Sequence, residues 1–185
     1  MGKVFDGIDA ALAGWLRAQP MFFVATAPSD LDGHLNLSPK GIDGTFAVLD
    51  HDRVAYLDLT GSGIETVAHL RDDGRIVLMF CAFYGPPRIV RLHGRATAVA
   101  VTDPAFALAV EAFPRPTPPG LRSVIEVTVA QVSDSCGFGV PLMDLVGQRP
   151  TLPDWAARKG PAGIAAYQAT RNRASVDGLP GLPTR

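Results

Sequence analysis

The sequence predicts a mainly β fold, an antiparallel barrel that is closed or nearly closed, with helices packed on its outside. Two observations lead to this class. Most segments are β-prone runs joined by short turns, and helical patterns occur only between some of them. The regular alternation of strand and helix that builds a parallel sheet is not seen. The length of 185 residues suits one domain with a buried core and a C-terminal extension.

The chain is expected to begin with a helix over residues 5–19. Its apolar residues recur at helical spacing until a proline ends the pattern: Ile8, Leu12, Trp15, Leu16 and Pro20. Two strand pairs follow, each around a short polar turn. Their four strands are expected at residues 21–27, 34–41, 46–50 and 53–59. Regular pairing of the second strand should end at Pro39, because proline has no N–H to donate to the ladder.

The stretch "YLDLTGSGIETVAHL", from Tyr56 to Leu70, changes from an alternating pattern to a helical one at a glycine-rich turn. Ser62 and Glu65 stand three residues apart ahead of the helical stripe, as in a capping box. In that motif the serine oxygen accepts from a backbone N–H and the glutamate reaches back. We therefore expect a helix that begins at this turn.

Long strands dominate the second half of the chain. Residues 75–83 form a continuous apolar run and should be buried on both faces of a sheet. Residues 88–101 form a long strand in which Gly94 marks a bulge or bend. Residues 123–132 alternate cleanly, which predicts a central strand.

Two further helical segments are expected. Asp103 and Pro104 are typical of an N-cap and a first helical position, so they predict a helix over residues 103–113. A proline-rich loop separates this helix from the last strand. Residues 155–172 carry a broken helical pattern in the tail.

The composition argues against several classes of protein. With 17 basic and 18 acidic residues, the formal net charge is -1, which does not suggest a nucleic-acid partner. No apolar run reaches the roughly 18–20 residues that a membrane helix needs, and no signal-peptide pattern opens the chain. We therefore expect a cytoplasmic protein that binds a small molecule and has no nucleic-acid or membrane partner.

The cysteines and histidines form neither a disulfide framework nor a metal-binding pattern. Cys81 and Cys136 lie far apart, and the four histidines never stand at metal-ligand spacing. Cys136, beside glycines, is either a reactive thiol or a small packed group. His93 and Cys136 are candidates for an acid or base because both are polar in apolar settings. The sequence does not decide which residue is catalytic.

The glycine-rich turn is the main candidate for an anion site. Gly61 and Gly63 would let the backbone approach a bound group closely, and free N–H groups at a helix start suit an anion. The alternative is that the turn only reverses the chain. Four residues could add positive charge to such a site: Lys40, Arg88, Arg91 and Arg95. The alternative is that these side chains are simply solvated at the surface. "GSG" does not extend to G-x-G-x-x-G, which disfavours a Rossmann site.

The order of these segments resembles the pyridoxamine 5'-phosphate oxidase-like family of FMN-binding split barrels. The resemblance covers residues 21–101 and rests on "FFVATA…DGHLNLSPKG", "VAYLDLTGSGIETVAHLRDDGRIVLMF" and "PRIVRLHGRATAV". It implies a six-stranded antiparallel Greek-key split barrel with peripheral helices, and a homodimer with FMN at the subunit interface. Residues 1–150 would form the FMN-binding domain. Residues 151–185 would form a helical extension that packs on the barrel or on the dimer partner.

The resemblance also implies which residues hold the cofactor. Lys40 matches the family's strand-ending lysine, and Ser62 matches the serine of the turn before the helix. Arg88 and Arg91 match two basic positions of the later strand. With their neighbours they give the expected cofactor-binding set: Ser38, Lys40, Thr60, Gly61, Ser62, Arg88 and Arg91.

Three departures from the oxidase pattern bear on the substrate. Gly63 and Ile64 stand where the oxidase has Arg-Lys after the turn serine, and Ile89 stands where it has a glutamine. The C-terminal substrate-binding signature is not visible in "SCGFGVPLMDLVGQR". The sequence therefore does not predict pyridoxamine 5'-phosphate as the substrate.

These features favour an FMN-dependent oxidoreductase that transfers hydride or electrons between a small substrate or nicotinamide and bound FMN. A non-catalytic flavin- or haem-binding or redox-sensing protein on the same barrel is the alternative. A deazaflavin could also take the place of FMN. The substrate, the electron donor and the acceptor are not predicted.

Overall fold

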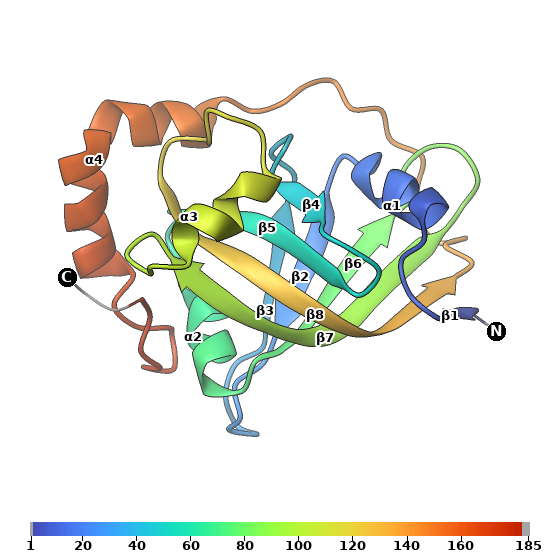
Figure 1. Cartoon of the computed structure of the whole chain (residues 1–185), viewed down its shortest axis with the longest axis horizontal. Helices are drawn as coiled ribbons and strands as arrows, with labels where there is room; N and C mark the ends of the chain where they lie inside the picture. The colour runs from blue at the N-terminus through green and yellow to red at the C-terminus, as the bar shows by residue number, and fades with distance from the viewer. Residues whose placement is uncertain (1, 183–185) are drawn as a thin grey trace.

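One antiparallel sheet of eight strands curls on itself and forms the body of the protein within residues 2–182, which the computed structural model describes (Figure 1). Its strand order is β3-β2-β6-β7-β8-β5-β4, and β1 pairs with β8. The strands are β1 (Val4–Phe5), β2 (Phe22–Thr26), β3 (Asn36–Lys40), β4 (Phe46–Val48), β5 (Arg53–Leu59), β6 (Arg75–Cys81), β7 (Ile89–Ala100) and β8 (Leu121–Ser135). The predicted antiparallel barrel is confirmed, with more strands than the six implied by the resemblance, and β1 was not expected.

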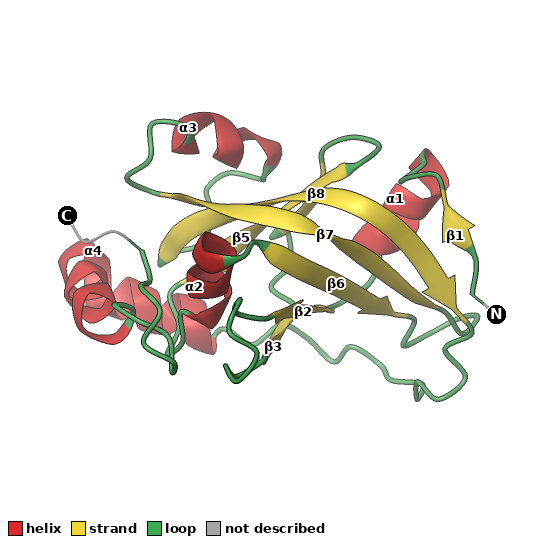
Figure 2. Cartoon of the chain, turned by 90° about the horizontal axis from the view of Figure 1, so that it is seen from below, coloured by secondary structure: helices red, strands yellow, loops and turns green. Residues whose placement is uncertain are grey.

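Helices lie outside the curled sheet, as predicted. They are α1 (Ala10–Arg17), α2 (Glu65–Asp72), α3 (Phe106–Ala109) and α4 (Thr151–Arg171). Both views place α1 and β1 at one end of the molecule and α4 at the other (Figures 1 and 2). Asp9 caps α1 by accepting the Leu12 N–H at 2.7 Å. α4 bends at Gly160, whose φ is 64°, just before Pro161, which explains its broken pattern.

Alternating side chains fill the interior of the barrel. Val24, Leu78 and Leu92 face one another in register on β2, β6 and β7, and none of them is exposed. Burying each such side chain stabilises the fold by about 1.5–3 kcal/mol. Val77 and Met79, on the other face of β6, are only half-buried. The expectation that this strand is buried on both faces is therefore wrong.

The two longest strands, β7 and β8, run between the two ends of the barrel. Ile89 pairs with Ser135 at one end, and Ala100 pairs with Ser123 at the other. A register shift at Gly94 confirms the predicted bulge, and an added side chain there would collide with the backbone of β8. β8 also pairs with β5 and β1, so its predicted central place is confirmed.

Two local expectations are wrong. β3 continues through Pro39 to Lys40, because it is the edge strand and its open side needs no hydrogen bond from proline. The helix expected over residues 103–113 is interrupted, and α3 has only four residues. Asp103 accepts the N–H of Ala105 and closes a turn ahead of α3.

Candidate functional site

The inward face of the edge strand β3 is polar, whereas the residues opposite Ser38 and Lys40 on the neighbouring strand β2 are apolar. Ser38 pairs in register with Val24, and Lys40 pairs with Phe22. Val24 and Phe22 are buried core residues, so Ser38 and Lys40 also point into the barrel. An edge strand tolerates such polar groups because its rim is not sealed by a further strand.

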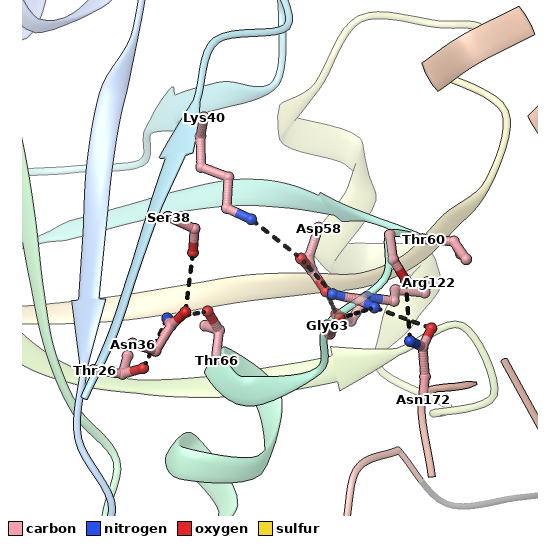
Figure 3. Close-up of polar contacts among 12 residues, drawn as sticks. Thr26, Asn36, Ser38, Lys40, Asp58, Thr60, Gly63, Thr66, Arg122 and Asn172 are labelled. Atoms are coloured by element: carbon pink, nitrogen blue, oxygen red, sulfur yellow. Dashed lines mark hydrogen bonds and ion pairs between the residues drawn. The ribbon is translucent and has the colours of Figure 1, made fainter. Parts of the chain in front are cut away.

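Asn36 joins this polar face to the start of α2. Its Nδ2 donates to the hydroxyl of Thr26 at 3.2 Å and to the hydroxyl of Thr66 at 3.1 Å (Figure 3). Its Oδ1 accepts from the Ser38 hydroxyl at 3.4 Å. Since Thr66 lies in the first turn of α2, strand β3 and the helix start form one connected network.

Lys40 reaches from β3 across to β5. Its Nζ lies 3.8 Å from Oδ1 of Asp58 and 6.0 Å from the ring centre of Tyr56. Asp58 is fully buried, and Arg122 donates to both its carboxylate oxygens, with Nε to Oδ2 at 2.5 Å and Nη2 to Oδ1 at 3.3 Å. Ser123 adds a bond at 3.2 Å. Two positive charges against one negative charge leave this group with a surplus positive charge.

The protonation states of two buried side chains follow from these contacts. Burial raises the pKa of Asp58, but Arg122 and Lys40 more than offset the rise, so its pKa lies below the ordinary 3.8. Burial and the charge of Asp58 raise the pKa of Tyr56 well above 10.0, so the phenol stays protonated. The Tyr56 hydroxyl finds no hydrogen-bond partner within residues 2–182. The phenol is fully buried beside the Thr66 hydroxyl.

Two buried side chains fix the turn of residues 60–63 by donating hydrogen bonds to its carbonyl oxygens. Asn172 Nδ2 donates to the carbonyl of Gly61 at 3.1 Å, and Arg122 Nη1 donates to the carbonyl of Gly63 at 2.8 Å. Arg122 Nη1 also donates to Oδ1 of Asn172 at 3.1 Å. Figure 3 shows these side chains converging on the turn.

The start of the turn is bonded both to Gly120, just before β8, and to α4. The hydroxyl of Thr60 donates to the carbonyl of Gly120 at 2.7 Å and accepts from Gln168 Nε2 at 2.7 Å. Gln168 and Asn172 also line a cavity of about 750 Å³ between α4 and the ends of β7 and β8. The extension therefore forms part of this end of the barrel.

The N–H groups of the same turn are free on their other side. None of the backbone N–H groups of residues 61–64 donates to an acceptor in the described part of the chain. Ser62 is exposed, and a Cβ added at Gly61 would meet no atom within 4 Å. The Glu65 side chain leans back over Gly63. The turn thus presents unused donors at the positive end of α2.

The capping box predicted from Ser62 and Glu65 is wrong. α2 begins at Glu65, its N-cap is Ile64, and no side chain bonds to a backbone N–H there. Ser62 lies outside the first helical turn, on the exposed part of the glycine-rich turn. The helix start keeps the free donors that a capping box would have used.

Arg88 and Arg91 lie at the opposite end of the barrel, where their own chain already binds them. The Arg88 guanidinium pairs with Asp134 at 3.2 Å and lies 5.0 Å from the ring centre of Trp15. Arg91 Nη1 donates to the hydroxyl of Ser135 at 3.1 Å. These contacts fix the start of β7 against the end of β8.

The fold brings some of the expected site residues together and keeps others apart. Five of the expected residues lie on β3 or in the turn of residues 60–63, close to the contacts of Asn36, Asp58 and Asn172. They are Ser38, Lys40, Thr60, Gly61 and Ser62. Arg88 and Arg91 lie at the start of β7, whereas the turn of residues 60–63 lies near the other end of this strand, beside Gly120. Lys40 shares a row of the sheet with Val90 through Phe22 and Phe80, and its side chain reaches Asp58 across the barrel.

The candidate acid and base lie away from the network. His93 lies on the outer face of β7 opposite Gln131. Cys136 is exposed, which excludes the packed alternative, whereas Cys81 is buried and burial raises the pKa of its thiol. Across residues 2–182, no three His, Cys, Asp or Glu side chains gather as a metal site would require.

The sequence reasoning missed Asp58, Arg122 and Asn172. Asp58 did offer a signal, because it stands two residues after Tyr56 on the inward face of an apolar strand, and a buried carboxylate needs a partner. Arg122 is such a partner on the neighbouring strand. Asn172 gave no local signal, since it binds a carbonyl 111 residues away.

Comparisons with known proteins relate this chain to a family. The sequence profile described as "Pyridoxamine 5'-phosphate oxidase" matches residues 8–136. The chain is 41% identical over 192 residues to "Pyridoxamine 5'-phosphate oxidase family protein ustO" of Aspergillus flavus, with 96% of this chain and 77% of that protein covered.

Solved structures of HupZ from Group A Streptococcus are similar in fold. One structure, of a variant, has a TM-score of 0.51 and 19% identity, and covers 69% of this chain and 99% of that chain. A second has a TM-score of 0.50 and 19% identity, with 68% and 91% covered. Separately, none of the helices described here combines the length and apolar character needed to cross a membrane.

Proposed function

The chain belongs to the pyridoxamine 5'-phosphate oxidase family, and from this premise we propose that it binds FMN and acts as an oxidoreductase. The turn of residues 60–63 carries the proposal. Its N–H groups are free, its oxygens are held from behind, and a group with surplus positive charge adjoins it. A phosphate monoester needs these features, because it requires several donors and a positive field.

The phosphate would bind the free N–H groups of residues 61–64, the Ser62 hydroxyl and Lys40. Bonds from a charged donor are roughly twice as strong as neutral ones, so Lys40 should contribute most per contact. The open space over Gly61 leaves room for the phosphate oxygens. Glu65 would turn away from Gly63, because its charge repels a phosphate.

The remainder of the cofactor would face the polar side of β3. Ser38 points into the barrel, and its hydroxyl oxygen can still accept a hydrogen bond. Thr60 would act by fixing the start of the turn, since both its bonds are made within the chain. Bound FMN supplies hydride and electron transfer, while these residues bind and orient it.

A homodimer would bring the arginine strand to the same cofactor from the other subunit. Arg91 uses one donor, on Ser135, and a guanidinium has five, so it can bind a further acceptor. Arg88 is held by Asp134 and would instead anchor the strand that carries Arg91. Leu35 and Leu37, 81% and 67% exposed beside the site, are apolar surface that a partner would cover. Sedimentation should give a dimer; a monomer that binds FMN would contradict this arrangement.

The absorbance spectrum of the purified protein tests FMN binding. Flavin bands, or quenching of added FMN fluorescence at micromolar concentration, are expected. A colourless protein that does not quench would contradict the proposal. Fluorescence of the released cofactor distinguishes FMN from a deazaflavin.

Reduction of the bound flavin tests the oxidoreductase role separately. Bleaching by NADH or NADPH, followed by recovery with an acceptor, is the expected result. A bound flavin that is never reduced would leave the binding role and remove the enzymatic one. Pyridoxamine 5'-phosphate belongs among the substrates tested, with no turnover expected, because the family's C-terminal substrate signature is absent from this sequence.

A further inference from the structure

We propose that Asn172 and Arg122 are positioning residues that aim the backbone N–H groups of Ser62 and Ile64 at the cofactor phosphate. The inference rests on the proposed function. Neither side chain would touch the phosphate, because both bind the opposite side of the turn. They would act through the carbonyl groups of Gly61 and Gly63.

The geometry of the peptide bond links the two sides of the turn. In a trans peptide, the C=O of one residue and the N–H of the next lie in one plane and point in opposite directions. In the described chain only the bond before Pro116 is cis, so the turn follows this rule. When Asn172 holds the carbonyl of Gly61, the N–H of Ser62 must point away from Asn172.

The second peptide is fixed in the same way. Arg122 holds the carbonyl of Gly63 at 2.8 Å, so the N–H of Ile64 points away from Arg122. Both N–H groups lack an acceptor in the described structure; Ser62 is exposed and Ile64 is 1% exposed, so the N–H of Ser62 is the more accessible donor. The two donors are separated by one residue at the start of α2.

The orientation of Asn172 is itself determined by its neighbours. Its Oδ1 accepts from Arg122 and its Nδ2 donates to Gly61, so reversing the amide would lose both bonds. Asn172 is 2% exposed and Arg122 is 4% exposed. The buried carboxylate of Asp58 fixes the other side of the guanidinium. A rigid chain of contacts therefore runs from Asp58 to the turn.

The extension is what supplies this support. Asn172 directly follows α4, and Gln168, one helical turn earlier, binds the hydroxyl of Thr60. Both residues lie beyond residues 8–136, the part matched by the family profile. The site would thus depend on a segment outside the matched barrel.

The variant Asn172→Ala tests the inference, with Thr170→Ala as its control. Thr170 is exposed and its hydroxyl bonds only to carbonyls of its own helix. Asn172→Ala should weaken FMN binding about tenfold, as expected for one net hydrogen bond, and leave riboflavin binding nearly unchanged. Thr170→Ala should change neither. Asn172→Asp keeps an acceptor for Arg122 but cannot donate to Gly61, so it should show the same loss.

A second measurement does not depend on flavin. Inorganic phosphate should shift the amide resonances of Ser62 and Ile64 in the wild-type protein, and these shifts should shrink in Asn172→Ala. If the wild type binds FMN and both Asn172 variants bind it equally well, this inference falls and the proposed function stands. Equal losses for FMN and riboflavin would also overturn it, because they would indicate general unfolding of the extension.

Failure of the proposed function gives a different result. The wild type could show phosphate-induced amide shifts that disappear in Asn172→Ala and yet not bind FMN. That result would support the positioning role of Asn172 and overturn the flavin assignment. Absence of both FMN binding and amide shifts in the wild type would overturn both.

Discussion

The two ends of the barrel use cationic side chains in opposite ways. At the α1 end, Arg88 and Arg91 bind acceptors and an aromatic ring of their own chain. At the α4 end, Arg122 and Lys40 share one carboxylate, so positive charge is in excess, and the adjoining turn keeps its N–H groups free. At the first end each arginine already has a partner in its own chain, whereas the turn at the second end has N–H groups without an acceptor in the described residues.

The difference teaches that a basic sequence motif does not by itself mark an anion site. The "PRIVR" segment has two arginines, yet within one chain they stabilise the fold. "LTGSGI" has no basic residue, but its backbone donors remain available because a buried network holds its oxygens. Unsatisfied donors, more than the number of charges, distinguish the two ends.

The largest effect is expected from Asp58→Asn, which breaks the network at the α4 end. It would leave Arg122 buried and Lys40 half-buried without a countercharge, and loss of one partner of a buried ion pair costs about 3–5 kcal/mol. The free energy of unfolding in urea measures this loss. Asp32→Asn is the control, because Asp32 is exposed, and it should stay near wild type. A loss as small as the control's would contradict the role given to Asp58.

The same residue predicts part of the acid sensitivity. The folded-state pKa of Asp58 is lowered, so its ionised form stabilises the fold above the ordinary pKa of 3.8. That stability is lost as the pH falls through the lowered pKa. Unfolding free energies between pH 7 and pH 3 should therefore fall less steeply for Asp58→Asn than for wild type. Parallel curves would mean that Asp58 does not contribute.

The next effect concerns the open side of the turn. Gly61→Ala adds a methyl group where no atom lies within 4 Å, so the fold should be unaffected. If phosphate occupies that space, FMN affinity should drop about tenfold, a loss of about 1.4 kcal/mol. Gly139→Ala, which also meets no atom, is the matched control. Equal FMN affinities for these two variants would place the ligand elsewhere.

The smallest effect is expected at the α1 end. Arg88→Ala removes a partly exposed ion pair and the contact with Trp15, together worth about 1 kcal/mol of stability. The ratio of FMN to riboflavin affinity should stay close to that of the wild type. A selective loss of FMN affinity would show that Arg88 serves the phosphate directly, and the contrast between the two ends would weaken.

Much of the fold follows from local patterns. β-prone and apolar runs between turns predicted β2 to β8, the glycine at position 94 predicted the bulge, and helical spacing predicted α1. These signals are local because strand and helix periods are set by neighbouring residues. The exceptions were also instructive. Pro39 was compatible with a strand because β3 is at the edge, and the Ser62 capping box failed because a helix start can leave its N–H groups free.

The site was predictable only in part. The glycine turn and Lys40 were visible because their residue types have obvious chemistry. The contacts that organise them were not visible, since Lys40 meets Asp58 across the barrel and Asn172 reaches Gly61 from the end of α4. Such contacts depend on how the sheet curls and where α4 docks, which no local period encodes.

The affinity of FMN relative to riboflavin, measured by fluorescence quenching for wild type and Lys40→Met, tests the central claim most directly. The two ligands differ by the phosphate, and methionine keeps an unbranched side chain without the charge. Wild type should bind FMN about tenfold or more tightly than riboflavin, and Lys40→Met should lose most of that preference while binding riboflavin as before. Equal affinities in the wild type, or equal losses for both ligands in the variant, would contradict a phosphate site at this end of the barrel.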